Sequence, residues 1–173
     1  MLPAYPPAAP QDPVEVYLLR QGDHTGVVLP APEPGRWIEY AFGDWEWYAN
    51  GRDSLAWGLL TLAVPSQGAL GRREFAGPPQ QDPVLRERGA ELHPFLAERA
   101  RVEALRNRLE AEFRASGVAP VLNPRNRLWM APSAESYSLG NQCSSRTVHW
   151  LEDLGCSIGG FGVAKSVELG PPR

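Results

Sequence analysis

The sequence predicts an α+β domain in which an antiparallel sheet packs against helices, and three observations support this fold class. Apolar, β-branched runs at 14–19, 25–29 and 37–42 follow one another closely, which is typical of consecutive strands. Apolar residues between 95 and 116 recur at spacings of three and four, which indicates an amphipathic helix that Gly117 ends. A second apolar stripe predicts a helix over 141–154 that ends at Gly155.

Composition and charge limit the domain organisation and the partners. The 173 residues suffice for one domain, and 17 Gly with 18 Pro place much of the chain in turns. Five prolines within 1–13 predict an extended lead-in outside the core, followed by a single domain over 14–173. The formal net charge of −3 excludes the basic footprint of a nucleic-acid-binding protein.

The remaining segments give weaker signals. A helix is expected over 55–64, capped by Asp53 or Ser54, and then a strand over 68–77. Turn residues dominate 123–134, a short strand is expected at 136–140, and 159–163 predicts a turn into a final strand or tail. No transmembrane run and no secretion signal are found, so we expect a soluble chain, cytoplasmic or in the cell envelope if a leader was trimmed.

Cys143 is the candidate nucleophile. Asn141 is expected to cap the second helix, which places this thiol in the first turn, where unpaired N–H groups and the helix dipole favour the thiolate. The same N–H groups could stabilise an oxyanion. A buried cysteine at a helix start is, however, often only a packing residue. Cys156 is interpreted as structural, and a disulfide between the two is not expected.

A thiol nucleophile needs a base, and the chain contains three histidines. His24 opens a predicted strand, where it can reach a cleft while the strand holds it, and is the best candidate. His149 lies on another side of the Cys143 helix, and His93 precedes a proline at an expected helix entrance.

The acidic residue that would orient His24 is either Glu39 or Asp44. If the loop before the third strand centres near Glu33, alternation puts Asp44 on the face of His24 and Glu39 on the other face. A bulge or an uneven loop would reverse this assignment. Both residues could also be ordinary exposed charges.

The motifs GDHTGVVLP, WIEYAFGDWEWY and YSLGNQCSSRTVHWLEDLG resemble a bacterial family of unknown function. That family is similar to the circularly permuted, papain-like branch of the NlpC superfamily that includes lecithin retinol acyltransferase-like proteins. The resemblance covers nearly the whole chain after Pro13. It implies a circularly permuted papain-like fold with Cys143 as nucleophile, His24 as base and Glu39 as the orienting residue. Ser144 and Arg146 depart from the Asn and Trp often found after the cysteine.

These observations predict a cysteine-dependent hydrolase or acyltransferase that acts on an amide, ester or thioester of a small-molecule or peptide substrate. No cofactor and no metal ion is expected, because the chain has no Cys-x-x-Cys pair and no second His at ligand spacing. The alternative is a catalytically silent module that binds a peptide or glycan. An aromatic group could line a cleft in either case, or could simply pack: Trp45, Trp47, Tyr48 and Trp57.

Overall fold

A seven-stranded sheet organises the computed structural model, which describes residues 1–22, 24–48, 65–138, 140–160 and 166–173. Within this part of the chain the strand order is β6-β2-β3-β4-β5-β8-β7, and all neighbours are antiparallel. The strands are β2 (Pro13–Gln21), β3 (His24–Pro30), β4 (Arg36–Asp44), β5 (Ser66–Ala76), β6 (Glu91–Glu98), β7 (Val121–Leu122) and β8 (Trp129–Tyr137). The α+β class with an antiparallel sheet is therefore confirmed.

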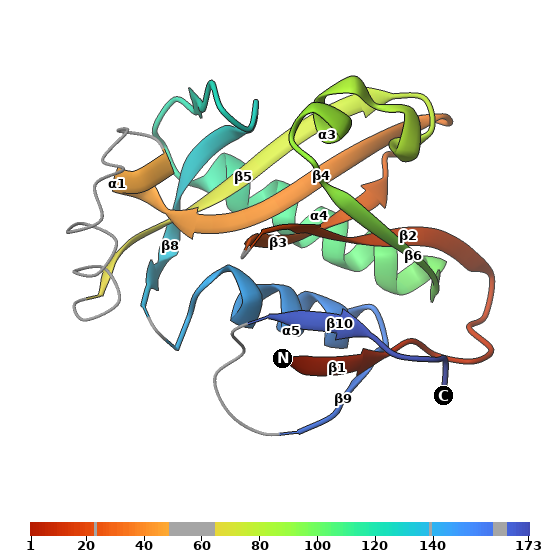
Figure 1. The fold of residues 1–173 in the computed structure, drawn as a ribbon. Helices are drawn as coiled ribbons and strands as arrows, with labels where there is room; N and C mark the ends of the chain where they lie inside the picture. The colour runs from red at the N-terminus through yellow and green to blue at the C-terminus, as the bar shows by residue number, and fades with distance from the viewer. Residues whose placement is uncertain (23, 49–64, 139, 161–165) are drawn as a thin grey trace.

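Helices cover both faces of this sheet (Figure 1). The described helices are α1 (Trp45–Tyr48), α3 (Pro83–Glu87), α4 (Arg99–Ala115) and α5 (Cys143–Asp153), with a 3₁₀ turn at Pro79–Gln81. The main core lies between α4, α5 and one face of the sheet, where Val27 and Leu29 of β3 pack with the two helices. Val28 points to the opposite face and packs with Leu85 of α3. None of the described helices is long and apolar enough to cross a membrane.

A second, three-stranded sheet lies against α5, and it contains the N-terminus. Its order is β10-β1-β9, formed by β1 (Leu2–Tyr5), β9 (Ser157–Ile158) and β10 (Val167–Leu169). Ala4 is fully buried in the main core. The expectation that 1–13 lies outside the core is therefore wrong for β1. Prolines do not prevent this pairing. The N–H of Leu2 donates to the backbone oxygen of Ser166 at 2.9 Å, and the backbone oxygen of Pro3 accepts from the N–H of Gly159 at 2.8 Å.

Several predicted elements are confirmed, and two have different bounds. The three strands expected at 14–19, 25–29 and 37–42 are β2, β3 and β4, and the strand at 68–77 is β5. The amphipathic helix begins only at Arg99, because the segment before it pairs with β2 as strand β6. The turn-rich segment expected over 123–134 ends early, since β8 already begins at Trp129 and pairs with β5. The helix expected over 55–64 lies outside the described residues.

Candidate functional site

The thiol of Cys143 lies at the first residue of α5, where the helix meets strand β3. Gln142 precedes the helix as its N-cap with no side-chain cap bond, and the Asn141 side chain instead donates to the backbone oxygen of Ser136 at 2.7 Å. Asn141 is therefore not the cap that the sequence predicted. The predicted position of Cys143 in the first turn of the helix is confirmed. The residue is 8% exposed there.

Burial decides the protonation state of this thiol. It raises the pKa of Cys143 above its ordinary value, although backbone N–H groups of Thr25 and Ser144 oppose the increase. The helix N–H groups alone predict a lowered pKa for Cys143, and this expectation is wrong because burial outweighs them. Burial also raises the pKa of Cys156, to about 12. Neither cysteine is in a disulfide.

His24 is the first residue of β3 and directly precedes Thr25, whose backbone N–H contacts the sulfur of Cys143. The strand start and the helix start are thus adjacent, as the sequence analysis required. His24 is partly exposed, but its Nε2 atom is buried. Burial, aided by the positive charge of Arg88, lowers the pKa of His24 to about 4. The imidazole is therefore neutral near pH 7.

The strand register places Glu39, and not Asp44, on the face of His24. Glu39 pairs with Val28, and Ala41 pairs with Gly26. Because side chains alternate along a strand, residues at even positions of β3 share their face with odd positions of β4. The condition that favoured Asp44, a loop centred near Glu33, is not met, because the loop pairs Pro30 with Trp37 and is one residue longer on its β4 side; this is the uneven loop that reverses the assignment.

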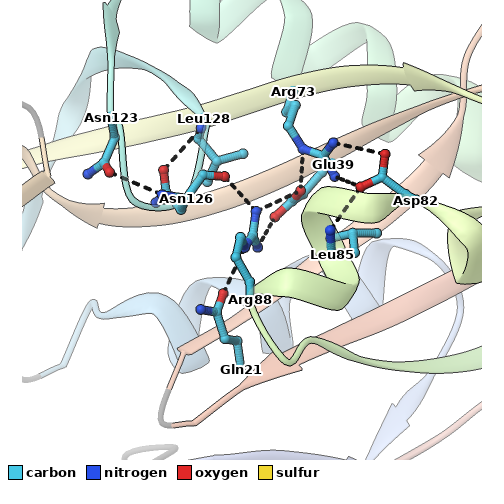
Figure 2. A network of polar contacts seen from close by, with 9 residues as sticks. All are labelled: Gln21, Glu39, Arg73, Asp82, Leu85, Arg88, Asn123, Asn126 and Leu128. Carbon is cyan, nitrogen blue, oxygen red and sulfur yellow. Dashed lines mark hydrogen bonds and ion pairs between the residues drawn. The ribbon is translucent and has the colours of Figure 1, made fainter.

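Glu39 is the centre of a buried ionic network between β4, β5 and α3 (Figure 2). Its carboxylate, in a residue that is 1% exposed, accepts from Arg88 Nη2 at 2.7 Å and from Arg73 Nε at 3.1 Å. Arg73 also forms a two-bond pair with Asp82, at 2.9 and 3.2 Å. Glu39 is thus not an ordinary exposed charge, and its two oxygens are occupied by arginines.

Arg88 connects this network to the strand end that carries His24. Its Nε donates to Oε1 of Gln21 at 3.1 Å, and Gln21 is the β2 residue paired with His24. Its Nη1 donates to the backbone oxygen of Asn126 at 2.7 Å. Arg88 therefore bonds three parts of the fold at once: Glu39 of β4, Gln21 of β2 and the loop over 123–128 (Figure 2).

Asp44 has a different, local function. Its Oδ1 accepts from the backbone N–H of Trp47 at 2.7 Å, and its Oδ2 accepts from the hydroxyl of Ser66. The carboxylate is 3% exposed. These contacts cap the start of α1 and tie it to β5, as expected of an aspartate before a helix.

The aromatic cleft that the sequence suggested is only partly within the described structure. Trp45 packs beside a small cluster of Ala41, Ala69, Leu128 and Met130. The side chain of Tyr48 and the whole of Trp57 lie outside the described residues. Trp45 is thus a partly buried side chain that packs against residues of β4, β5 and β8.

Sequence reasoning missed the arginines of the network. Asp82 carries a readable signal, because an aspartate before Pro83 is a typical helix start, and its Oδ1 indeed accepts from the N–H of Leu85 at 2.9 Å. Arg73 and Arg88 carry no such signal in a chain with many arginines. Among the described residues no cluster of three or more His, Cys, Asp or Glu side chains could hold a metal ion.

Comparison of the chain with protein-family models, with curated proteins and with solved structures found no match. The functional interpretation therefore depends on the geometry of the site.

Proposed function

We propose that this chain is a cysteine-dependent hydrolase or acyltransferase of circularly permuted papain-like fold, related to the NlpC superfamily, with Cys143 as nucleophile and His24 as base. One observation carries the proposal. The sulfur of Cys143, in the first turn of α5, contacts the backbone N–H of the residue that follows His24. The two candidate side chains are separated by 119 positions in the sequence, and yet their backbones meet at one corner of the sheet.

The raised pKa of Cys143 and the lowered pKa of His24 support a mechanism that starts from neutral groups. The thiol attacks the carbonyl carbon of an amide, ester or thioester while its proton passes to the His24 imidazole. The resulting imidazolium then gives this proton to the leaving group as the tetrahedral intermediate collapses to a thioester. Water or a second acceptor, deprotonated by His24, then attacks the thioester carbon. The C–S bond breaks, and the imidazolium gives its proton to the departing sulfur, which restores the thiol.

Backbone N–H groups would stabilise the developing oxyanion. The first turn of α5 has N–H groups without helical acceptors, and the N–H of Thr25 points to the same sulfur. Donors that are fixed in a buried site stabilise negative charge without reorganisation. This arrangement fits a transition state with charge on oxygen better than it fits a resting thiolate.

Glu39 acts in this proposal as a positioning residue through Arg88. The carboxylate holds the guanidinium that in turn bonds Gln21, the cross-strand partner of His24. Removing the carboxylate would therefore release Arg88 and disturb the strand end on which His24 lies.

A catalytically silent binding module is the second candidate, because the same two pKa directions are also expected of a buried site that performs no chemistry. A thiolate and imidazolium pair in the resting state would need opposite shifts. The two candidates differ in one measurable property, the reactivity of the Cys143 thiol.

Alkylation by a chloroacetamide tests the proposal. We expect the intact protein at pH 7.5 to be labelled at Cys143 at least tenfold faster than at Cys156, because the neutral imidazole of His24 accepts the proton of Cys143 during the attack. His24→Ala should abolish this selectivity, whereas His149→Ala, at an exposed residue on the same helix, should leave it unchanged. Equal rates at the two cysteines of the intact protein would exclude the enzyme and favour the silent module.

A further inference from the structure

The start of α5 lacks the side-chain cap that commonly holds a helix N-terminus. Gln142 is the N-cap residue, and its side chain makes no cap bond. Helix ends fray unless other contacts hold them. Cys143 is the first residue of this helix, so the contacts that hold the first turn also determine where the thiol lies.

Arg146, three residues after Cys143, binds two carboxylates from different parts of the fold. Its Nη2 donates to Oε2 of Glu112 on α4 at 3.0 Å, and its Nη1 donates to Oε1 of Glu135 on β8. The guanidinium also lies over the ring of Phe42 on β4, with its carbon 5.5 Å from the ring centroid. The arginine side chain is 13% exposed. One side chain in the first turn thus attaches α5 to α4, β4 and β8.

Further bonds hold both carboxylates. Oε1 of Glu112 accepts from the hydroxyl of Ser133 on β8 at 2.6 Å. Oε2 of Glu135 accepts from Nδ2 of Asn141 at 3.3 Å, while its Oε1 accepts from the arginine of the first turn. The chain before Cys143 and the chain after it are therefore fixed to the same carboxylate.

The charge of this group does not favour a thiolate. One guanidinium and two carboxylates give a formal charge of 1 − 2 = −1. Nearby negative charge raises the pKa of a thiol, so a charge effect of the whole group would oppose ionisation of Cys143. A guanidinium also holds its acceptors in fixed directions, because its donors lie in one plane. The geometry of the group, and not its charge, is therefore what it offers to the site.

We propose that Arg146 is a positioning residue for Cys143, an inference that rests on the proposed function. By binding Glu112 and Glu135 it holds the first turn of α5 in one orientation, and so keeps the thiol where His24 takes its proton. A lysine at this position keeps the positive charge but not the planar set of donors.

The pH dependence of alkylation tests this role. In the intact protein the neutral imidazole of His24 accepts the thiol proton, so the rate of chloroacetamide labelling at Cys143 should be level between about pH 5.5 and 7.5. In Arg146→Met the rate should instead rise about tenfold per pH unit, as for a thiol that reacts only as its thiolate. Arg146→Lys should behave in the same way, because charge alone does not restore the geometry.

Asp153→Asn is the matched control. Asp153 bonds Arg108 of α4, so this change removes an ion pair between the same two helices. It lies at the other end of α5, ten residues after Cys143 and thus about 15 Å along the helix axis. The level range of the labelling rate should be retained in this variant.

Glu135→Gln is a second test variant, which keeps the inference testable if Arg146→Met does not fold. It keeps the size of a side chain that is 45% exposed but weakens the bonds to Arg146 and Asn141. Labelling of Cys143 should then rise with pH, less steeply than in Arg146→Met. Amide hydrogen exchange over 146–148 should become about threefold faster, which is the size of effect expected of one partly exposed ion pair.

The same exchange measurement needs no reaction and separates this inference from the proposed function. In Arg146→Met we expect exchange over 146–148 to be at least tenfold faster than in the intact protein, because the first turn then opens locally. Unchanged exchange would overturn the role of Arg146. A level labelling rate that survives in Arg146→Met would also overturn it and keep the enzyme. A rate that rises with pH already in the intact protein, together with faster exchange in Arg146→Met, would reject the proposed function and keep Arg146 as the residue that holds the helix start.

Discussion

The hydroxyl of Thr25 donates to Oγ1 of Thr147 at 3.1 Å, in a fully enclosed contact between β3 and α5. The same Thr25 presents its backbone N–H to the sulfur of Cys143, four residues before Thr147 on the helix. One residue thus holds the helix start against the strand that carries His24.

Breaking this contact should lower stability and disturb the site together. Thr147→Val keeps the shape of the side chain but leaves the buried Thr25 hydroxyl without its partner, and we expect a loss of about 1–3 kcal/mol in the free energy of unfolding. Urea denaturation measures this loss. The double variant Thr25→Val/Thr147→Val should cost less than the sum of the two single changes, because no hydroxyl is then left unpaired. Strict additivity would show that the hydroxyls do not interact.

The buried ionic network predicts a large penalty for removing Arg88. Arg88→Met leaves Glu39 with Arg73 alone in a site that is 1% exposed, and an uncompensated buried charge costs about 3–5 kcal/mol. Thermal or urea unfolding measures this penalty. Arg88→Lys should restore little, because an ammonium group lacks the planar set of donors that reaches Glu39, Gln21 and Asn126.

A surface pair provides the matched control for this prediction. Arg99 bonds Asp12 at 2.6 Å, but both side chains are largely exposed. Arg99→Met should leave the unfolding midpoint almost unchanged, as is typical of solvated ion pairs. Equal effects of the two substitutions would contradict a structural role for the buried network.

These contacts mark the limit of what the sequence alone predicts. The runs that form β2, β3 and β4 and the buried stripe of α5 follow from local periodicity, so they were predictable. The face of Glu39 was not, because a one-residue difference in the loop between Pro30 and Trp37 reverses it. The partnership of Glu39 with Arg88 was also hidden, since a distance of 49 positions in the sequence leaves no local pattern. The pairing of β1 with β10 joins the two ends of the chain and is equally non-local.

The lowered pKa of His24 predicts how stability depends on pH. Its value is about 4 in the folded chain, below the ordinary 6.5, so between these values the unfolded chain binds more protons. Stability should therefore be fully present above pH 6.5 and fall as the pH drops to 4, by about 3 kcal/mol for this one group. His24→Gln should flatten this part of the profile, measured by urea unfolding at several pH values. His149→Gln, at an exposed ring, should leave the slope intact. A slope that is the same with and without His24 would contradict the burial of its ring.

A close approach of the backbones of β3 and β4 at Gly26 supplies the last prediction. A Cβ atom added there would lie 2.5 Å from the carbonyl oxygen of Tyr40, which is backbone and cannot rotate away. Gly26→Ala should therefore force β3 away from β4 and cost about 1–3 kcal/mol, as overpacking typically does. Gly26 is only two residues from His24, so the same displacement should reduce the preference of a chloroacetamide for Cys143 over Cys156. Gly140→Ala is the control, because a Cβ at Gly140 would meet no atom within 4 Å although the residue is near the start of α5. If Gly26→Ala lowered stability and left the labelling preference untouched, the position of β3 would not control the reactivity of Cys143.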